Sequence, residues 1–230
     1  MKAQAIKDIK KSLPPSFVNL YHSHGLAISF SIKSVYGKLS RQFIRPSFPK
    51  LEDGKLYLHL GCGGVNHEKF VNIDALPAPH IHYIRGLDNL SPFKDNSVDL
   101  IYGSHCLEHF SHLKVPNVLG EWYRVLKTDG ILRLSVPNFD ALCEIYKESG
   151  NDLDSILEVL MGRQDYKYNF HMTAFTQSSL TRLFKNVGFR EVREWQPGSC
   201  ELTTFRDFSN HKIPANQKYY PISLNLEAIK

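Results

Sequence analysis

Three histidines and a glutamate crowd the stretch GSHCLEHFSH, which runs from Gly103 to His112. His105, Glu108 and His109 have the H-x-x-E-H spacing with which one class of zinc proteases binds its metal. Such a site needs the string inside a long helix and a further carboxylate from elsewhere in the chain. Here the string directly follows VDLIYGS, an apolar run typical of a buried strand, so His105 should stand at a strand end. We therefore expect no metal at this string, and an activity that is independent of metal.

A glycine-rich loop indicates a different chemistry. The stretch LHLGCGG places Gly61 and Gly63 after a short apolar run, and Asp74 closes the next such run. A dinucleotide fingerprint would need a third glycine where Asn66 stands, and an acid about 20 residues after the first glycine. Asp74 follows Gly61 by only 13 residues, so the helix that would face a pyrophosphate must be very short or missing. A nucleoside ligand without phosphates fits better than NAD, with Asp74 accepting hydrogen bonds from the ribose hydroxyls.

Short apolar runs alternate with helical patterns after a proline-containing linker, RPSFPKLEDG. This alternation predicts an α/β fold with a doubly wound sheet. We expect strands at 55–61, 69–75, 80–86, 98–104 and 131–137, helices at 109–130, 138–150 and 176–189, and two late antiparallel strands at 190–196 and 221–230. Ligands of such sheets bind beyond the carboxyl ends of the strands. One crevice should therefore gather the residues that follow the strands, namely Gly61, Asp74, Asp88, Ser104, His105 and Asn138.

Five stretches, taken in order, resemble a class I S-adenosylmethionine (SAM)-dependent methyltransferase: LHLGCGG, NID, LDNLSPFKDNSVDLIYGSHCLEHF, EWYRVLKTDGILRLSVPNFD and LTRLFKNVGFREV. They are most similar to a small bacterial, type 11-like group associated with surface-glycan biosynthesis. The resemblance covers residues 55–230 and implies a mostly parallel, Rossmann-like sheet of seven strands. It also implies SAM as the cofactor and O-methylation of a sugar hydroxyl, in a glycan or glycan precursor, as the reaction.

The resemblance also implies which residues bind the cofactor. The methionine part would rest on the glycine loop and be approached from the fourth strand, the ribose would be held at the end of the second strand, and the adenine would lie beside the loop that follows the third. In that order the implied residues are Gly61, Cys62, Gly63, Ser104, His105, Asp74, Asp88, Asn89 and Leu90. The chain departs from the wider superfamily in its short first loop and in the early position of Asp74.

Methyl transfer to oxygen also needs a group that removes the proton of the acceptor within hydrogen-bond reach. Histidine is the natural candidate near neutral pH. His171 lies in GRQDYKYNFHMTAF, a stretch rich in side chains that can hydrogen-bond a polyhydroxylated acceptor. We expect His171 to be the general base, with His105 as the second choice, and residues 150–180 to form a lid on the acceptor side.

The net charge of +5 is unevenly distributed. Residues 1–50 carry nine Lys or Arg and one acid, whereas the remaining residues carry 19 bases and 22 acids. This asymmetry predicts a basic, helical N-terminal arm and linker at 1–50, before a methyltransferase domain at 51–230, and suggests peripheral contact of the arm with an anionic membrane surface. The four cysteines form no C-x-x-C pair, and no apolar run is long enough to span a bilayer. We expect a cytoplasmic protein, peripheral at the inner face of the membrane.

The residues leave other functions open. The fold could bind SAM without catalysing transfer, or it could act on a nucleic acid or on another small molecule. A nucleic-acid partner is the less favoured, because few aromatic residues are interleaved with the charges of the arm and no N-P-P-Y-like tetrapeptide follows the fourth strand. The sequence does not predict the oligomeric state.

Overall fold

The computed structural model describes residues 35, 37–40, 45–51, 53–203 and 205–230, so most of the predicted basic arm lies outside the described residues. Seven strands form one sheet: β1 (Tyr57–Leu60), β2 (Val71–Asp74), β3 (Tyr83–Ile84), β4 (Val98–Ser104), β5 (Leu126–Pro137), β6 (Glu191–Glu194) and β9 (Ser223–Ile229). Their order is β3-β2-β1-β4-β5-β9-β6, and β9 runs in the direction opposite to that of the other six strands. The prediction of a mostly parallel, Rossmann-like sheet of seven strands is confirmed.

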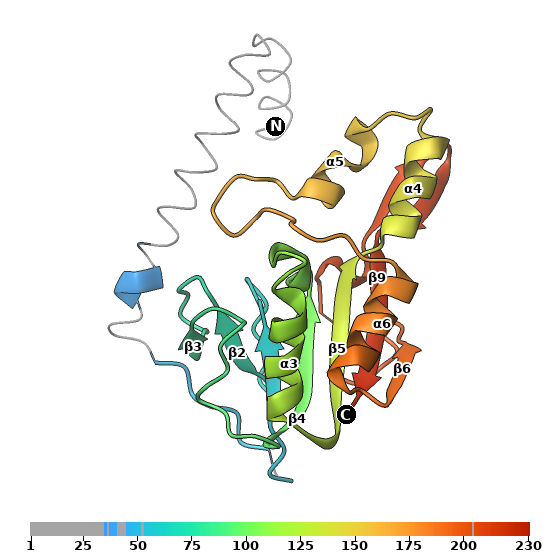
Figure 1. Cartoon of the computed structure of the whole chain (residues 1–230). Coiled ribbons are helices and arrows are strands. Elements are labelled where there is room, and N and C mark those ends of the chain that lie inside the picture. Colours follow the sequence, from blue (N-terminus) through green and yellow to red (C-terminus); the bar gives the residue numbers. More distant parts are fainter. Residues whose placement is uncertain (1–34, 36, 41–44, 52, 204) are drawn as a thin grey trace.

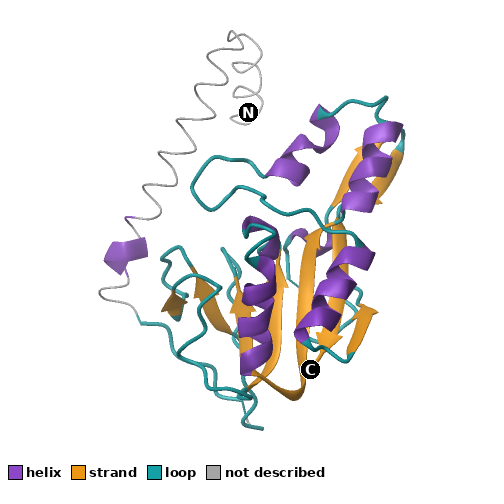
Figure 2. Ribbon diagram, in the orientation of Figure 1, coloured by secondary structure: helices purple, strands orange, loops and turns teal. Residues whose placement is uncertain are grey.

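Helices flank this sheet and extend beyond one of its edges. They are α3 (Val115–Val125), α4 (Phe139–Glu148), α5 (Asp154–Met161) and α6 (Gln177–Val187), with short 3-10 turns η1 (Leu107–His109) and η2 (Phe208–Asn210). Figures 1 and 2 show α3 and α6 in front of the sheet and α4 and α5 beyond its upper edge. The carboxyl ends of β4 and β5 lie on this side of the sheet, so α5 and the loop after it lie where a ligand is expected. Among the described residues, no helix combines the length and hydropathy needed to cross a membrane.

The central strands β1 and β4 and the second half of β5 are buried over most of their length, because both of their faces are covered. Leu58 and Ile101 are fully buried in the main core, which includes apolar residues of α3 and α6. A separate aromatic cluster includes the buried side chains of Tyr102 and Trp195, and Phe205 packs against it. Burial on both sides explains why these strands lack the alternation of a half-exposed sheet.

The connection between β1 and β2 contains turns and no helix, as the short spacing to Asp74 predicts. Gly61 N–H donates to Ile73 O at 2.9 Å, and Val65 N–H donates to Cys62 O at 2.8 Å. These bonds hold the glycine loop close to the carboxyl end of β2.

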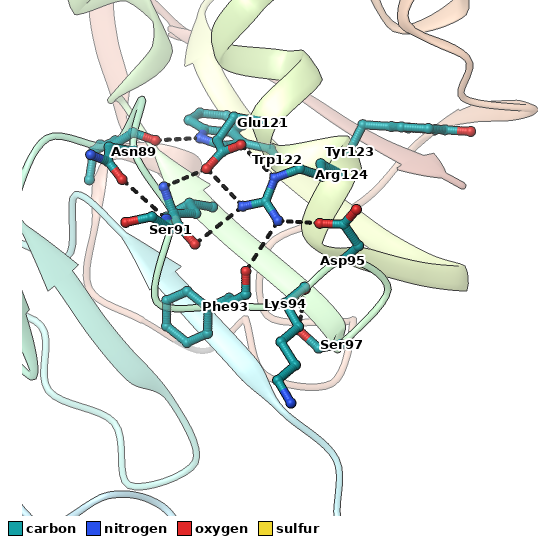
Figure 3. Close-up of polar contacts among 12 residues, drawn as sticks. Asn89, Ser91, Phe93, Lys94, Asp95, Ser97, Glu121, Trp122, Tyr123 and Arg124 are labelled. Atoms are coloured by element: carbon teal, nitrogen blue, oxygen red, sulfur yellow. Dashed lines mark hydrogen bonds and ion pairs between the residues drawn. The ribbon is translucent and has the colours of Figure 1, made fainter.

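A polar network ties the loop between β3 and β4 to α3 (Figure 3). Trp122 Nε1–H donates to Leu87 O at 2.7 Å, and Glu121 Oε1 accepts the Leu90 N–H at 2.7 Å. Arg124 donates to both oxygens of Glu121, at 2.8 and 2.9 Å. The last turn of α3 thus fixes the loop that carries the residues predicted for the adenine side of the site.

We expect Trp122→Phe to lower the free energy of unfolding by about 1–3 kcal/mol, because Leu87 O would stay buried without its donor. Tyr123→Phe is the matched control on the same helix, since the Tyr123 hydroxyl makes no hydrogen bond to described residues. Urea denaturation of both variants measures the difference. Equal stability losses would show that the Trp122 hydrogen bond contributes nothing specific.

The boundary between α3 and β5 differs from the prediction. α3 ends at Val125 rather than at Gly130, and β5 begins at Leu126, which pairs with Val98. Gly130 lies inside the strand, where a Cβ would stand 2.8 Å from Lys127 O. Gly130 is therefore needed for a close backbone approach in an irregular strand and does not terminate the helix.

Two elements near the carboxyl edge are absent from the prediction. They are α5 and the hairpin of β7 (Lys212–Ala215) and β8 (Lys218–Pro221). Together with α4 they enclose a small second core that includes Ile145 and Ile156. This core supports the segment that covers the carboxyl edge of the sheet.

Candidate functional site

A cavity of about 480 Å³ lies at the carboxyl ends of β1 and β4, beneath the loop between α5 and α6. A doubly wound sheet binds its ligand at this edge. Six residues predicted from the sequence line the cavity: Gly61, Cys62, Gly63, Ser104, His105 and His171. The structure thus brings the predicted cofactor loop and the predicted acceptor-side histidine into one cavity.

The loop after β1 depends on its glycines. Gly61 and Gly63 have left-handed backbone angles, with φ of +64° and +52°. A Cβ on Gly61 would lie 2.9 Å from the Cβ of Cys106, whereas no atom stands within 4 Å of the position of a Cβ on Gly63. The space at Gly63 is therefore open, and a ligand can approach the backbone closely there.

Asp74 ends β2 beside this loop. Its Oδ2 accepts the Gly63 N–H at 3.0 Å, and its Oδ1 accepts the Leu76 N–H at 2.8 Å. An ionised carboxylate has about four lone-pair sites, so Asp74 keeps the capacity to accept hydrogen bonds from two ribose hydroxyls. Asp74 lies where the ribose partner is predicted.

The three residues predicted for the adenine side do not share one environment. Asp88 and Asn89 are exposed, on a loop that begins where the Leu87 side chain approaches the glycine loop. Leu90, in contrast, is fully buried in the main core, and its N–H is taken by Glu121. Leu90 anchors the loop from inside the core, and its role as a cofactor-binding residue stays a prediction.

His105 stands between β4 and η1 in a left-handed conformation, with φ of +51°. Its N–H donates to Ser135 O at 2.8 Å, and its Nε2 lies 2.8 Å from Ser223 Oγ. The Ser223 hydroxyl donates its proton to Phe208 O at 2.7 Å, so the Nε2–H of His105 must donate to Ser223. The Nδ1 of His105 faces Glu108 Oε1 at 3.3 Å. Both ring nitrogens are engaged within the protein, and these contacts hold the strained backbone in place.

Glu108 is fully buried in η1. The sequence predicts a long helix from residue 109 onward, but η1 ends already at His109 and α3 begins only at Val115. Neither carboxylate oxygen receives a hydrogen bond of good geometry from the described residues. Burial raises the pKa of Glu108, but the contact with His105, followed by the electrostatic effect of His109 and His171, holds the pKa below its usual range. The cavity wall therefore contains a buried negative charge among three imidazoles.

In both His109 and His171, a hydrogen bond to a backbone carbonyl fixes which ring nitrogen carries the proton. His171 Nδ1 lies 2.8 Å from Val159 O, and His109 Nδ1 lies 3.1 Å from Phe170 O. Because a carbonyl oxygen only accepts, each Nδ1 carries a proton and each neutral ring has its lone pair on Nε2. Burial lowers the pKa of His171, with Glu108 opposing the shift, which favours the neutral ring. The two ring centroids are 4.9 Å apart.

Backbone hydrogen bonds bring His171 to η1 across a long stretch of sequence. The N–H groups of Met172 and Thr173 both donate to Glu108 O, at 2.7 and 3.2 Å. The Thr173 hydroxyl donates to Phe110 O at 2.7 Å. The loop between α5 and α6 is thereby attached to the turn that carries the H-x-x-E-H string.

The cavity also contains residues that the sequence does not single out. Arg206 and Asp207 line it from the loop between β6 and η2, and Glu158 lines it from α5. No motif or periodicity marks these positions, so no sequence signal could have found them. Glu108 and His109 are different, because their spacing is visible in the sequence and only their meeting with a distant histidine is not.

Residues 66–134 match a protein family described as "Methyltransferase domain". No curated protein matches the chain. Solved structures similar to it include a SAM-dependent methyltransferase from Archaeoglobus fulgidus, with 17% identity, a TM-score of 0.49, and coverage of 86% of this chain and 94% of that one. Another SAM-dependent methyltransferase, from Thermotoga maritima, has 16% identity, a TM-score of 0.49, and coverage of 94% and 97%. The Burkholderia thailandensis 1,6-didemethyltoxoflavin-N1-methyltransferase, with its acceptor and S-adenosylhomocysteine bound, has 14% identity, a TM-score of 0.48, and coverage of 99% and 89%.

The residues of the cavity fit SAM. The open space at Gly63 admits a ligand close to the backbone, and Asp74 beside it can accept from ribose hydroxyls. Ser104 also lines the cavity, and its buried Oγ has no hydrogen-bond partner of good geometry among the described residues. The loop opens no helix whose N-terminus could hold phosphates, which agrees with a nucleoside cofactor that has none.

We expect Gly61→Ala to destabilise the protein by about 1–3 kcal/mol, because alanine would be held at a positive φ, and to weaken SAM binding. Gly64→Ala is the control. Gly64 has no positive φ, and no atom stands within 4 Å of the position of its Cβ. Thermal unfolding and calorimetric titration with SAM measure both effects, and identical behaviour of the two variants would contradict the role given to Gly61.

The matched family segment contains β2 with Asp74 and β4 with the string that follows it. The sheet order places both elements at one edge, around the cavity that fits SAM. The segment that matches the methyltransferase family thus supplies part of the cavity whose residues fit SAM.

Proposed function

We propose that the protein transfers the methyl group of SAM to a hydroxyl oxygen of a polyhydroxylated acceptor, of the sugar or glycan-precursor class. The observation that carries this proposal is the set of charged and amide side chains among the residues that line the cavity. They are Glu158, Arg163, Asp165, Asn169, Arg206 and Asp207. Carboxylates, amides and guanidinium groups can hydrogen-bond several hydroxyls at once, whereas a planar, apolar acceptor would favour mostly apolar and aromatic walls.

The reaction requires three bond changes. The acceptor hydroxyl loses its proton, its oxygen bonds to the methyl carbon, and the carbon–sulfur bond breaks with its electron pair left on sulfur. When bound, SAM supplies a methyl group that is already activated on a positively charged sulfur. The residues of the chain have to bind the acceptor, align its hydroxyl with the methyl group, and keep water out.

His171 is the residue that we place next to the acceptor hydroxyl. The sequence predicts it as the general base, with His105 as the second choice. The geometry favours His171, since its Nε2 carries a lone pair and its ring lines the cavity. His105 directs its ring nitrogens to Ser223 and Glu108, so it holds its neighbours in position. His171 Nε2 would therefore meet the hydroxyl, either directly or through a bound ion.

A transfer assay with methyl-labelled SAM tests the proposal. The acceptor panel contains free sugars, nucleotide sugars and oligosaccharides, beside amines, thiols and planar phenols. We expect label in a sugar-class product, with the methyl group located on oxygen by NMR spectroscopy and mass spectrometry. Transfer to nitrogen or sulfur, or a clear preference for planar phenols, would contradict the proposed acceptor class and leave the SAM assignment unchanged.

A further inference from the structure

Among the described residues, Glu108, His109 and His171 form a group whose ligand atoms all lie within 4.8 Å of one another. We infer that this group binds a divalent transition-metal ion of the zinc type, and that the open coordination position of the ion receives the acceptor hydroxyl. The identity of that hydroxyl rests on the proposed function, but the ion site does not. The inference opposes the expectation, drawn from the string alone, that no metal binds here.

The two histidines are fixed in the form that binds metals. The Nδ1–H of His171 donates to Val159 O, and that of His109 donates to Phe170 O. Metal-binding histidines almost always donate their other ring N–H to such an acceptor, because this sets the tautomer and the orientation of the ring. Each ring therefore has an Nε2 lone pair available, and both residues line the cavity.

Glu108 supplies the third ligand. Its buried carboxylate lacks well-aligned hydrogen-bond donors among the described residues, and a bound ion would compensate for them. Its side chain is 0% exposed, and no hydrogen bond of good geometry reaches either of its oxygens from described residues. A buried carboxylate without donors is strongly unfavourable unless a cation lies beside it. His105 contacts the same carboxylate at 3.3 Å and is itself held by Ser223, which makes it a positioning residue for the ligand.

The ligand atoms lie within 4.8 Å of one another, so an ion would have to draw them closer together. His171 Nε2 lies 3.9 Å from Glu108 Oε1, and two ligands of a tetrahedral ion with bonds of about 2.0 Å stand about 3.3 Å apart. Two histidines and a glutamate, with the fourth position open, are a ligand set of catalytic zinc. Since His109 and His171 both line the cavity, the fourth position faces the space for the acceptor.

An ion in this place changes the role of His171. A divalent ion lowers the pKa of an oxygen ligand that it binds, so the coordinated hydroxyl can release its proton to solvent before its oxygen attacks the methyl carbon. The Nε2 lone pair of His171 is then used in the bond to the ion and cannot accept a proton. His171 is a metal ligand in this account, instead of the general base that the sequence predicts.

The test is a metal titration of the full chain after treatment with a chelator, in the absence of SAM and acceptor. Zn²⁺ binding is measured by calorimetry, and Co²⁺ binding by its visible absorption. We expect one ion per chain, and a loss of affinity of about a hundredfold or more in Glu108→Gln, His109→Asn and His171→Asn, at or above the loss seen when an outer partner of a ligand is changed. His112→Asn is the matched control, because His112 is exposed and belongs to the same stretch of sequence.

Absence of stoichiometric binding, or binding that none of the three ligand variants weakens, would overturn the inference. A SAM titration of each variant confirms its fold, and His109→Asn carries the test if the change at the buried Glu108 prevents folding. Failure here and failure of the proposed function are distinguishable. A chain that binds SAM but no metal removes only the ion site, whereas a chain that binds metal but methylates no hydroxyl removes only the acceptor assignment.

Discussion

His171→Ala should lower the turnover of methyl transfer by about a hundredfold or more, while the affinity for SAM stays almost unchanged. The ring of His171 lines the part of the cavity under the loop between α5 and α6, and its Nε2 points toward Glu108. Its loss therefore removes either the ion or the base that acts on the hydroxyl, without touching the glycine loop or Asp74. Steady-state kinetics with the identified acceptor and a separate SAM titration measure the two quantities.

Chelation separates the two roles of His171. If the residue is a metal ligand, wild-type turnover should disappear with a chelator and return when Zn²⁺ or Co²⁺ is added back, and His171→Ala should recover little with either ion. If it is a base, the chelator should leave wild-type turnover intact. A His171→Ala variant with full turnover would remove the residue from the acceptor site under both accounts, and His112→Ala serves as the control.

Asp74→Ala should weaken the binding of SAM and of S-adenosylhomocysteine by about ten- to a hundredfold, or about 1.5–3 kcal/mol. The variant loses a charged acceptor for the ribose hydroxyls, and it also frees the N–H groups of Gly63 and Leu76. Asp74→Asn keeps one acceptor oxygen and should recover part of the affinity. Unchanged affinity in the alanine variant would place the ribose site elsewhere.

Local signals in the sequence predict the cofactor half of the site. The spacing from Gly61 to Asp74 predicts a connection without a helix, and the structure confirms it. Asn138 caps α4 through its side chain, and Gly188 ends α6 with φ of +119°, both close to the bounds of the helices predicted at 138–150 and 176–189. Such features depend on neighbours within a few residues, so the sequence contains the information directly.

The acceptor half depends on contacts between distant segments. His171 reaches Glu108 because Met172 and Thr173 donate to a carbonyl more than 60 residues earlier in the chain. No periodicity in residues 151–170 predicts that these hydrogen bonds form. The expectation of no metal considered the string by itself, without the histidine that the loop brings beside it. The burial of Leu90 under α3 likewise depends on a helix that lies outside its own motif.

Calorimetric titration of the purified full chain with SAM, S-adenosylhomocysteine and NAD tests the central assignment most directly. The geometry of the Gly61–Gly63 loop and Asp74 predicts one-to-one binding of SAM and of S-adenosylhomocysteine, and no binding of NAD, because no helix follows the loop to hold a pyrophosphate. Binding of NAD in preference to SAM, or binding of neither compound by a folded chain, would contradict the assignment.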